Sequence, residues 1–181
     1  IDRGLWKKYP AEEFMQRFED FFYKPTMVWQ QAFENLDIKA RYALLVFASM
    51  GKEIYLEDWY TSFLYFCKMT YSQLGLVCEN FEWKKIIKVL QDCFIKTINY
   101  KGHTIVSYFN PSILDFIVTY LVELKDIQRL LIQNSYYVEQ LCTIFRDSPT
   151  SFFGYDSYII ITEELYQDIV NRFEHLMSIN P

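Results

Sequence analysis

Residues 106–121 read VSYFNPSILDFIVTYL, and they join a β-prone segment to an apolar helix with no loop between. Asn110 is a good N-cap residue, and Pro111 suits the first helical position because its missing N–H would have no partner there. Ser112 fits the helix start, and Asp115 lies where the helix dipole favours an acid. The stretch therefore predicts a strand fixed directly to a helix, so that a tilt of the strand should move the helix as well.

The residues before this junction predict a β-hairpin and, before it, three helices. FIKTINY (94–100) and HTIVSYF (103–109) are β-rich and are joined by Lys101 and Gly102, a turn signal. Helices are expected over 38–50, capped by Asp37 and ended by Gly51, and over 57–71 and 81–94. The first is apolar nearly all round after Tyr42, which indicates the centre of the core.

The short run EIYL (53–56) should be a third strand beside this hairpin. Helix, short strand, helix, helix and hairpin is the order of a winged helix. The lysine-bearing helix 81–94 then takes the place of the recognition helix, and the hairpin 94–109 is the wing.

The rest of the chain is predicted to be helical. Amphipathic patterns indicate helices over 11–23 and 27–36 before the winged helix, and over 125–135, 136–145 and 162–177 after it, with a loop over 148–157. We therefore expect a mostly α chain in three parts: a leading helix (1–25), a winged-helix-like domain (26–121) and a helical extension (122–181) that could begin an α-solenoid.

The composition is that of a packed globular protein, with 51% hydrophobic and 23% charged residues. A net charge of −5 argues against a dedicated nucleic-acid binder, and no apolar run is long enough for a membrane span. The four cysteines form no CxxC pair, which favours free thiols and a cytoplasmic location. Because the chain begins with Ile1 rather than Met, we expect a piece of a longer protein.

The sequence carries no recognisable catalytic or metal-binding motif. His103 and His175 have no partner at metal-ligand spacing, acid pairs fall at predicted helix starts, and no GxSxG occurs. We expect no catalytic residue, no metal site and no enzymatic activity in this segment. A small hydrolase with an unrecognised site is the remaining, weaker alternative.

One concentration of positive charge lies on the predicted recognition helix and wing. It consists of Lys84, Lys85, Lys88, Lys96 and Lys101. Over residues 81–101, only Glu82 and Asp92 oppose these lysines. They predict a solvated or interdomain face, or alternatively contacts to DNA phosphates in a winged-helix transcriptional regulator. The helix offers Gln91 but no Arg for reading bases, which favours the first interpretation.

Three segments resemble the winged-helix domain of bacterial STAND NTPases, which are large signal-transducing ATPases, many of them in anti-phage defence. WQQAFENLDIKARYALLVFASMGKEIYLEDW (29–59) is similar to the opening of that domain, and LQDCFIKTINYKGHTIVSYFNPS (90–112) to its last helix and wing. VSYFNPSILDFIVTYL resembles the junction that closes it. The resemblance covers roughly residues 28–121.

The resemblance implies a regulatory, non-catalytic segment that couples a sensor region to a nucleotide-binding domain. In such proteins the ATPase module precedes the winged helix, a helical sensor follows it, and the protein oligomerises on activation. ATP or ADP and Mg²⁺ would belong to the parent protein, because no GxxxxGK[ST] occurs here. Many relatives place a nucleotide-contacting His just before the junction helix, where this chain has Phe109 beside Asn110.

The partners implied are other domains of the parent chain. The residues expected to carry the coupling are Phe109, Asn110, Pro111, Ser112, Asp115 and Phe116, the two phenylalanines through packing.

Overall fold

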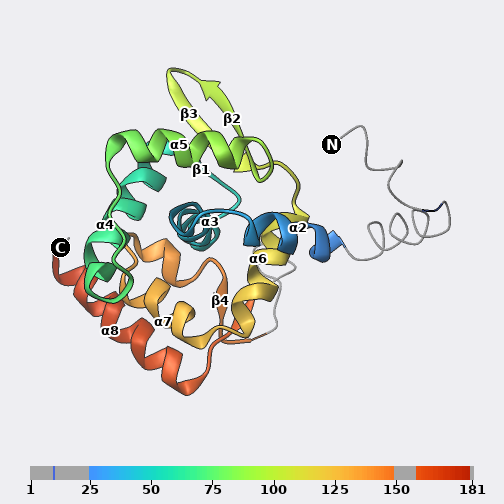
Figure 1. Cartoon of the computed structure of the whole chain (residues 1–181). Helices are drawn as coiled ribbons and strands as arrows, with labels where there is room; N and C mark the ends of the chain where they lie inside the picture. The colour runs from blue at the N-terminus through green and yellow to red at the C-terminus, as the bar shows by residue number, and fades with distance from the viewer. Residues whose placement is uncertain (1–9, 11–24, 149–157, 180–181) are drawn as a thin grey trace.

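The computed structural model describes residue 10 and residues 25–148 and 158–179; it is mostly helical with a small antiparallel sheet (Figure 1). The elements, in chain order, are α2 (Pro25–Glu34), α3 (Ile38–Met50), β1 (Glu53–Tyr55), α4 (Leu56–Leu74), α5 (Asn80–Gln91), β2 (Ile95–Tyr100), β3 (His103–Tyr108), α6 (Ser112–Val122), α7 (Lys125–Gln133), the 3₁₀ helix η2 (Val138–Leu141), β4 (Phe145–Arg146), β5 (Ile159–Ile160) and α8 (Glu163–Ile179). The predicted fold class, mostly α with a small hairpin, is confirmed. The helix predicted over 11–23 and nearly all of the loop over 148–157 lie outside the described residues.

Strands β1, β2 and β3 form one small sheet, as expected for a winged-helix-like domain. β3 lies between β1 and β2 and is antiparallel to both. In the hairpin, Tyr100 pairs with His103, so Lys101 and Gly102 form the turn, with φ of 51° and 87°. Positive φ at both turn positions matches the twist of the flanking strands. The predicted hairpin and the predicted third strand are both confirmed.

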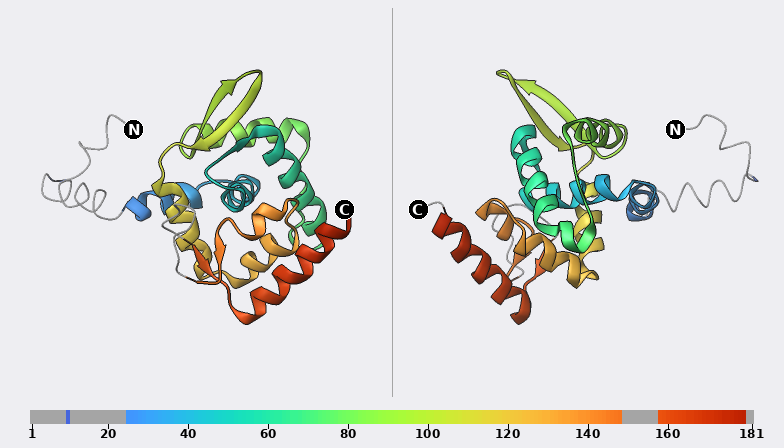
Figure 2. Two further views of the ribbon diagram at one scale, coloured as in Figure 1. Left: turned by 180° about the vertical axis from the view of Figure 1, so that it is seen from behind. Right: turned by 60° about the vertical axis from the view of Figure 1, so that its left-hand side comes forward.

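Helix α3 lies at the centre of the molecule, with the other helices around it (Figures 1 and 2). Its N-cap Asp37 accepts a hydrogen bond of 2.9 Å from the backbone N–H of Ala40, and Gly51 ends it at φ 133°. Its buried residues lie on every side: Ala40, Ala43, Leu44, Leu45, Val46, Phe47, Ala48 and Ser49. A helix that is apolar all round must be enclosed, which explains its central position.

Helix α5 packs one face on the core and leaves the other in solvent. Trp83, Ile86 and Leu90 are buried, and the Trp83 ring lies 4.9 Å from that of Trp59. The opposite face carries the lysines, because the apolar residues recur with the helical period and so occupy only the inner face. The inner face therefore determines the outward direction of the lysines.

One predicted helix is wrong. Residues 136–145 do not form an α-helix; they form η2 and then β4, which pairs in parallel with β5. The side chain of Gln140 accepts the backbone N–H groups of Tyr136 and Tyr137, which closes a tight turn in place of a helical one. The backbone of Ile144 then accepts a 2.7 Å hydrogen bond from Ile159. These hydrogen bonds satisfy backbone N–H and C=O groups that would otherwise bond to each other within an α-helix.

Residues after 121 pack into the same core as the winged helix. Their buried apolar side chains belong to one cluster with those of α3 and α6: Leu131, Ile132, Leu141, Ile144, Phe145, Ile159, Leu165 and Leu176. Arg172 of α8, 7% exposed, donates hydrogen bonds to the Ser135 carbonyl and to the Tyr65 hydroxyl. The domain boundary predicted after residue 121 stays a prediction, and side chains from the two sides of it pack against each other.

Candidate functional site

The strand β3 and the helix α6 are joined without slack. The N–H of Phe109 still donates to the Phe94 carbonyl at 2.9 Å, so pairing with the neighbouring segment continues one residue past β3. Asn110 Oδ1 then accepts from both the N–H and the hydroxyl of Ser112, each at 3.0 Å. Pro111 has helical angles, φ −54° and ψ −34°. The regular hydrogen-bond pattern of α6 begins at Ser112, so Pro111 lies at the cap position, one residue later than predicted for the cap. The Asn110 side chain still satisfies the N–H of Ser112, as a capping side chain does.

The structure adds Trp29, for which the sequence predicted only a place in the helix over 27–36. Its indole Nε1–H donates to Ser112 Oγ at 3.0 Å, and Ser112 Oγ donates to Asn110 Oδ1. The Trp29 ring also lies 6.1 Å from the ring of Phe94, at the start of the wing. One chain of hydrogen bonds therefore links α2 to the junction and to α6, and the ring contact brings α2 against the start of the wing. No local pattern links positions 83 residues apart, so no sequence signal indicated this pair.

The two junction phenylalanines differ in their surroundings. Phe116 is 4% exposed and meets Phe33 of α2 edge-on, with ring centroids 5.7 Å apart. Phe109 is 64% exposed, so it is not packed within the described part of this chain, and its predicted role in coupling through packing stays a prediction. Side chains alternate along an extended segment, and because Tyr108 points inward at 6% exposure, Phe109 points outward. Asp115 is half-buried in the first turn of α6, as the helix dipole favours.

The five predicted lysines are all exposed, at the end of the molecule formed by α5 and the wing (Figure 1). They are not alone there: Phe81, Val89, Ile98 and Tyr100 are between 43% and 66% exposed. Lys85 Nζ lies 4.3 Å from the centre of the Phe81 ring. A face that mixes lysines with large apolar side chains suits a protein surface better than it suits phosphates alone.

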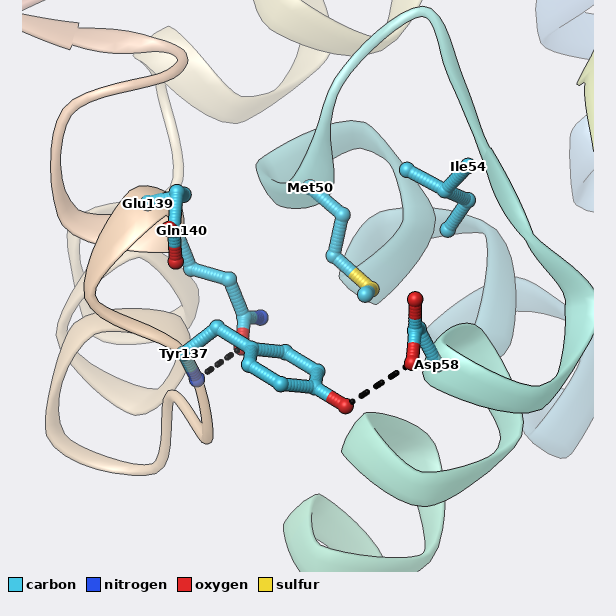
Figure 3. A pocket seen from close by; sticks show the side chains of 6 residues that line it. All are labelled: Met50, Ile54, Asp58, Tyr137, Glu139 and Gln140. Carbon is cyan, nitrogen blue, oxygen red and sulfur yellow. Dashed lines mark hydrogen bonds between the residues drawn. The ribbon is translucent and has the colours of Figure 1, made fainter. Parts of the chain in front are cut away.

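A surface cavity of about 280 Å³ lies between η2 on one side and the end of α3, β1 and the start of α4 on the other (Figure 3). It is lined by Met50, Ile54, Asp58, Tyr137, Glu139 and Gln140. The Tyr137 hydroxyl donates to Asp58 Oδ1 at 3.2 Å, and burial, reinforced by this carboxylate, raises the pKa of Tyr137 to about 12. A tyrosine that keeps its proton at neutral pH serves here as a hydrogen-bond donor, so the pair holds η2 against α4.

Among the described residues, no group of three or more His, Cys, Asp or Glu side chains is placed to hold a metal ion. His103 and His175 are exposed, and the His103 ring lies 5.5 Å from that of Tyr55. All four cysteines fall in the described part of the chain and are free thiols. Burial raises the pKa of Cys67 to about 12 and that of Cys78 to about 11, which suppresses the reactive thiolate.

Comparison with known proteins identified no relative. No protein-family model matches the chain, and searches of curated proteins and of solved structures found no match. Within residues 25–148 and 158–179, none of the helices combines the length and the apolar character needed to cross a bilayer.

Proposed function

We propose that this chain is a non-catalytic regulatory segment of a larger STAND-type signalling ATPase in the cytoplasm, coupling a sensor region to a nucleotide-binding domain. ATP or ADP and Mg²⁺ would bind the parent's ATPase module, and the partners of this segment would be neighbouring domains, with assembly of several copies on activation. The observation that carries the proposal is the hydrogen-bonded chain from Trp29 through Ser112 to Asn110.

The packing of α6 explains how this junction could transmit movement. Helix α6 contacts α2, α3 and α7, and its inner side chains are fully enclosed. Close-packed interiors transmit strain, so displacement of the wing reaches α6 and then α7 instead of being absorbed locally. Phe109, exposed beside the junction, offers a neighbouring domain an apolar contact from which to apply the displacement.

The first experiment measures coupling in this chain. Trp29→Phe and Ser112→Ala remove the two ends of the same hydrogen bond, and the double variant closes a thermodynamic cycle. Amide hydrogen exchange should rise in both the wing and α6 in each single variant. The double variant should be less destabilised than the sum of the two singles. Independent effects of the two substitutions, with exchange confined to one element, would contradict the coupling.

The second experiment addresses signalling in the complete protein. Pro111→Gly loosens the junction and Asp115→Ala weakens the helix start; both should impair triggered nucleotide hydrolysis or assembly more than they lower the melting temperature. Thr119→Ala, at an exposed position of the same helix, is the matched control. Normal signalling in both junction variants, with intact stability, would remove the proposed function.

A second candidate function is DNA binding, favoured by the exposure of all five lysines on α5 and the wing. A gel shift with duplex DNA across salt concentrations tests it, because phosphate contacts make affinity fall steeply with salt. Lys84→Ala together with Lys88→Ala should then reduce the salt slope by about 2, roughly one for each phosphate contact. The absence of a shift at low salt excludes this alternative.

A further inference from the structure

Helix α8 presents a second apolar stripe that nothing in the described chain covers. Its inner stripe, with Leu165 and Leu176, packs on the core. The outer stripe consists of Tyr166, Val170, Phe173 and Met177, at spacings of four, three and four residues. Tyr166 is 54% exposed, Phe173 45% and Met177 50%. A stripe of this spacing over three turns fits one face of another helix.

The border of this stripe is acidic. Glu163 and Glu174 fall beside it on the helical wheel, and α8 contains no lysine. The single arginine of α8, Arg172, is buried and directed at the Ser135 carbonyl. A helix that covers the stripe should therefore carry apolar side chains together with positive charge.

Helix α5 of this chain has that chemistry. Its outward face carries Phe81, 66% exposed, and Val89, 43% exposed, among Lys84, Lys85 and Lys88. Helices α5 and α8 lie at opposite ends of the molecule in all three views (Figures 1 and 2). One copy therefore cannot bring its own two helices together, whereas two copies can.

We propose that α8 of one copy docks on α5 of a second copy, in a head-to-tail contact between the acid-bordered apolar stripe of α8 and the exposed apolar and lysine side chains of α5. A contact between two different surfaces leaves a free α5 at one end and a free α8 at the other, so the assembly grows beyond a dimer or closes into a ring. This contact does not depend on the proposed signalling function, because it follows from the two surfaces alone.

The test uses the purified chain in sedimentation equilibrium, without DNA. The weight-average mass should rise with protein concentration and fall when salt screens the charge pairing. Phe173→Glu disrupts the α8 surface, and Lys84→Glu with Lys88→Glu reverses the α5 surface; each variant should remain monomeric. Lys125→Glu is the matched control, because it changes an exposed lysine outside both surfaces and should leave association unchanged. Circular dichroism establishes that each variant is folded, and Met177→Glu replaces Phe173→Glu if that variant is not.

The decisive measurement mixes the two defective variants. The Phe173→Glu variant keeps an intact α5 surface and the lysine variant keeps an intact α8 surface, so an equimolar mixture should form a dimer and stop there. A symmetric α8–α8 dimer, unaffected by the lysine changes, would overturn the proposal. A chain that stays monomeric at every concentration, or variants that do not complement each other, would overturn it as well.

Discussion

Replacing Gln140 with methionine should destabilise the whole fold, because one side chain serves four partners. Gln140 is 3% exposed; its Oε1 accepts from the Ser62 hydroxyl and from the N–H groups of Tyr136 and Tyr137, at 2.8 to 3.0 Å. Its Nε2 donates to Ser49 Oγ at 2.9 Å, but Ser49 retains its own bond to a carbonyl. Three donors thus lose their acceptor. Each unsatisfied buried group costs about 1–3 kcal/mol, and the cost is smaller where water can reach the group. The expected loss of stability is therefore about 3–5 kcal/mol.

Urea denaturation followed by circular dichroism and tryptophan fluorescence measures this loss. The two signals should give one shared transition, because Gln140 ties η2 to the last turn of α3 and to α4. Glu139→Gln, at the exposed neighbouring position, is the control and should change stability by no more than about 0.5 kcal/mol. A loss below about 1 kcal/mol for Gln140→Met, or separate transitions, would refute the view that the C-terminal helices and the winged helix fold together.

Three further predictions concern the thiols, the wing turn and the pH dependence of stability. Iodoacetamide at pH 8 should label exposed Cys142 well before Cys67, since burial raises the pKa of Cys67 to about 12; equal labelling of the two peptides by mass spectrometry would contradict this. Lys101→Gly should stabilise the fold by about 0.5–1 kcal/mol in urea titrations, because φ of 51° strains a lysine but not a glycine; a loss of stability would show that the contact of Lys101 with the Tyr100 ring outweighs this strain. The hydrogen bond from Lys39 lowers the pKa of Glu82. The bond therefore stabilises the fold at pH values above the ordinary pKa of 4.5, and this stabilisation is lost as the pH falls through the lower pKa of the folded state. In the Glu82→Gln variant the melting temperature should fall less steeply as the pH is lowered. An unchanged dependence at acid pH would refute the assignment of this effect to Glu82.

Features predictable from the sequence were those determined by neighbouring residues. Asp37 and Gly51 mark the two ends of α3, Asn110 and Pro111 precede the start of α6, and Lys101 and Gly102 form the turn of the hairpin. Each of these features depends on short-range backbone geometry. The apolar period identified the buried sides of α3 and α5 in the same way. Because a winged helix is a series of such local units, the order of its helices and strands could be predicted without knowledge of how they pack.

Features that sequence reasoning missed depend on residues far apart. Trp29 meets Ser112 across 83 positions, and Gln140 meets Ser49 across 91. Over residues 136–145 the local pattern was compatible with a helix, but a buried glutamine and pairing with the strand at Ile159 gave the backbone better partners. The exposure of Phe109, in contrast, follows from a local rule: side chains alternate along an extended segment, and Tyr108 points inward.

The position of α6 constrains how coupling can be separated from stability. Phe116 is buried against Phe33, so truncating either side chain should cost about 3–5 kcal/mol and would impair any function through loss of the fold. The hydrogen bonds of Asn110, Ser112 and Trp29 lie at a partly exposed site, where the loss of one costs about 1 kcal/mol. Only this second set can change how the wing moves α6 while the chain stays folded. A defect produced by core substitutions therefore says little about coupling. A defect produced by Ser112→Ala, whose melting temperature should fall by only about 2–4 °C, isolates it.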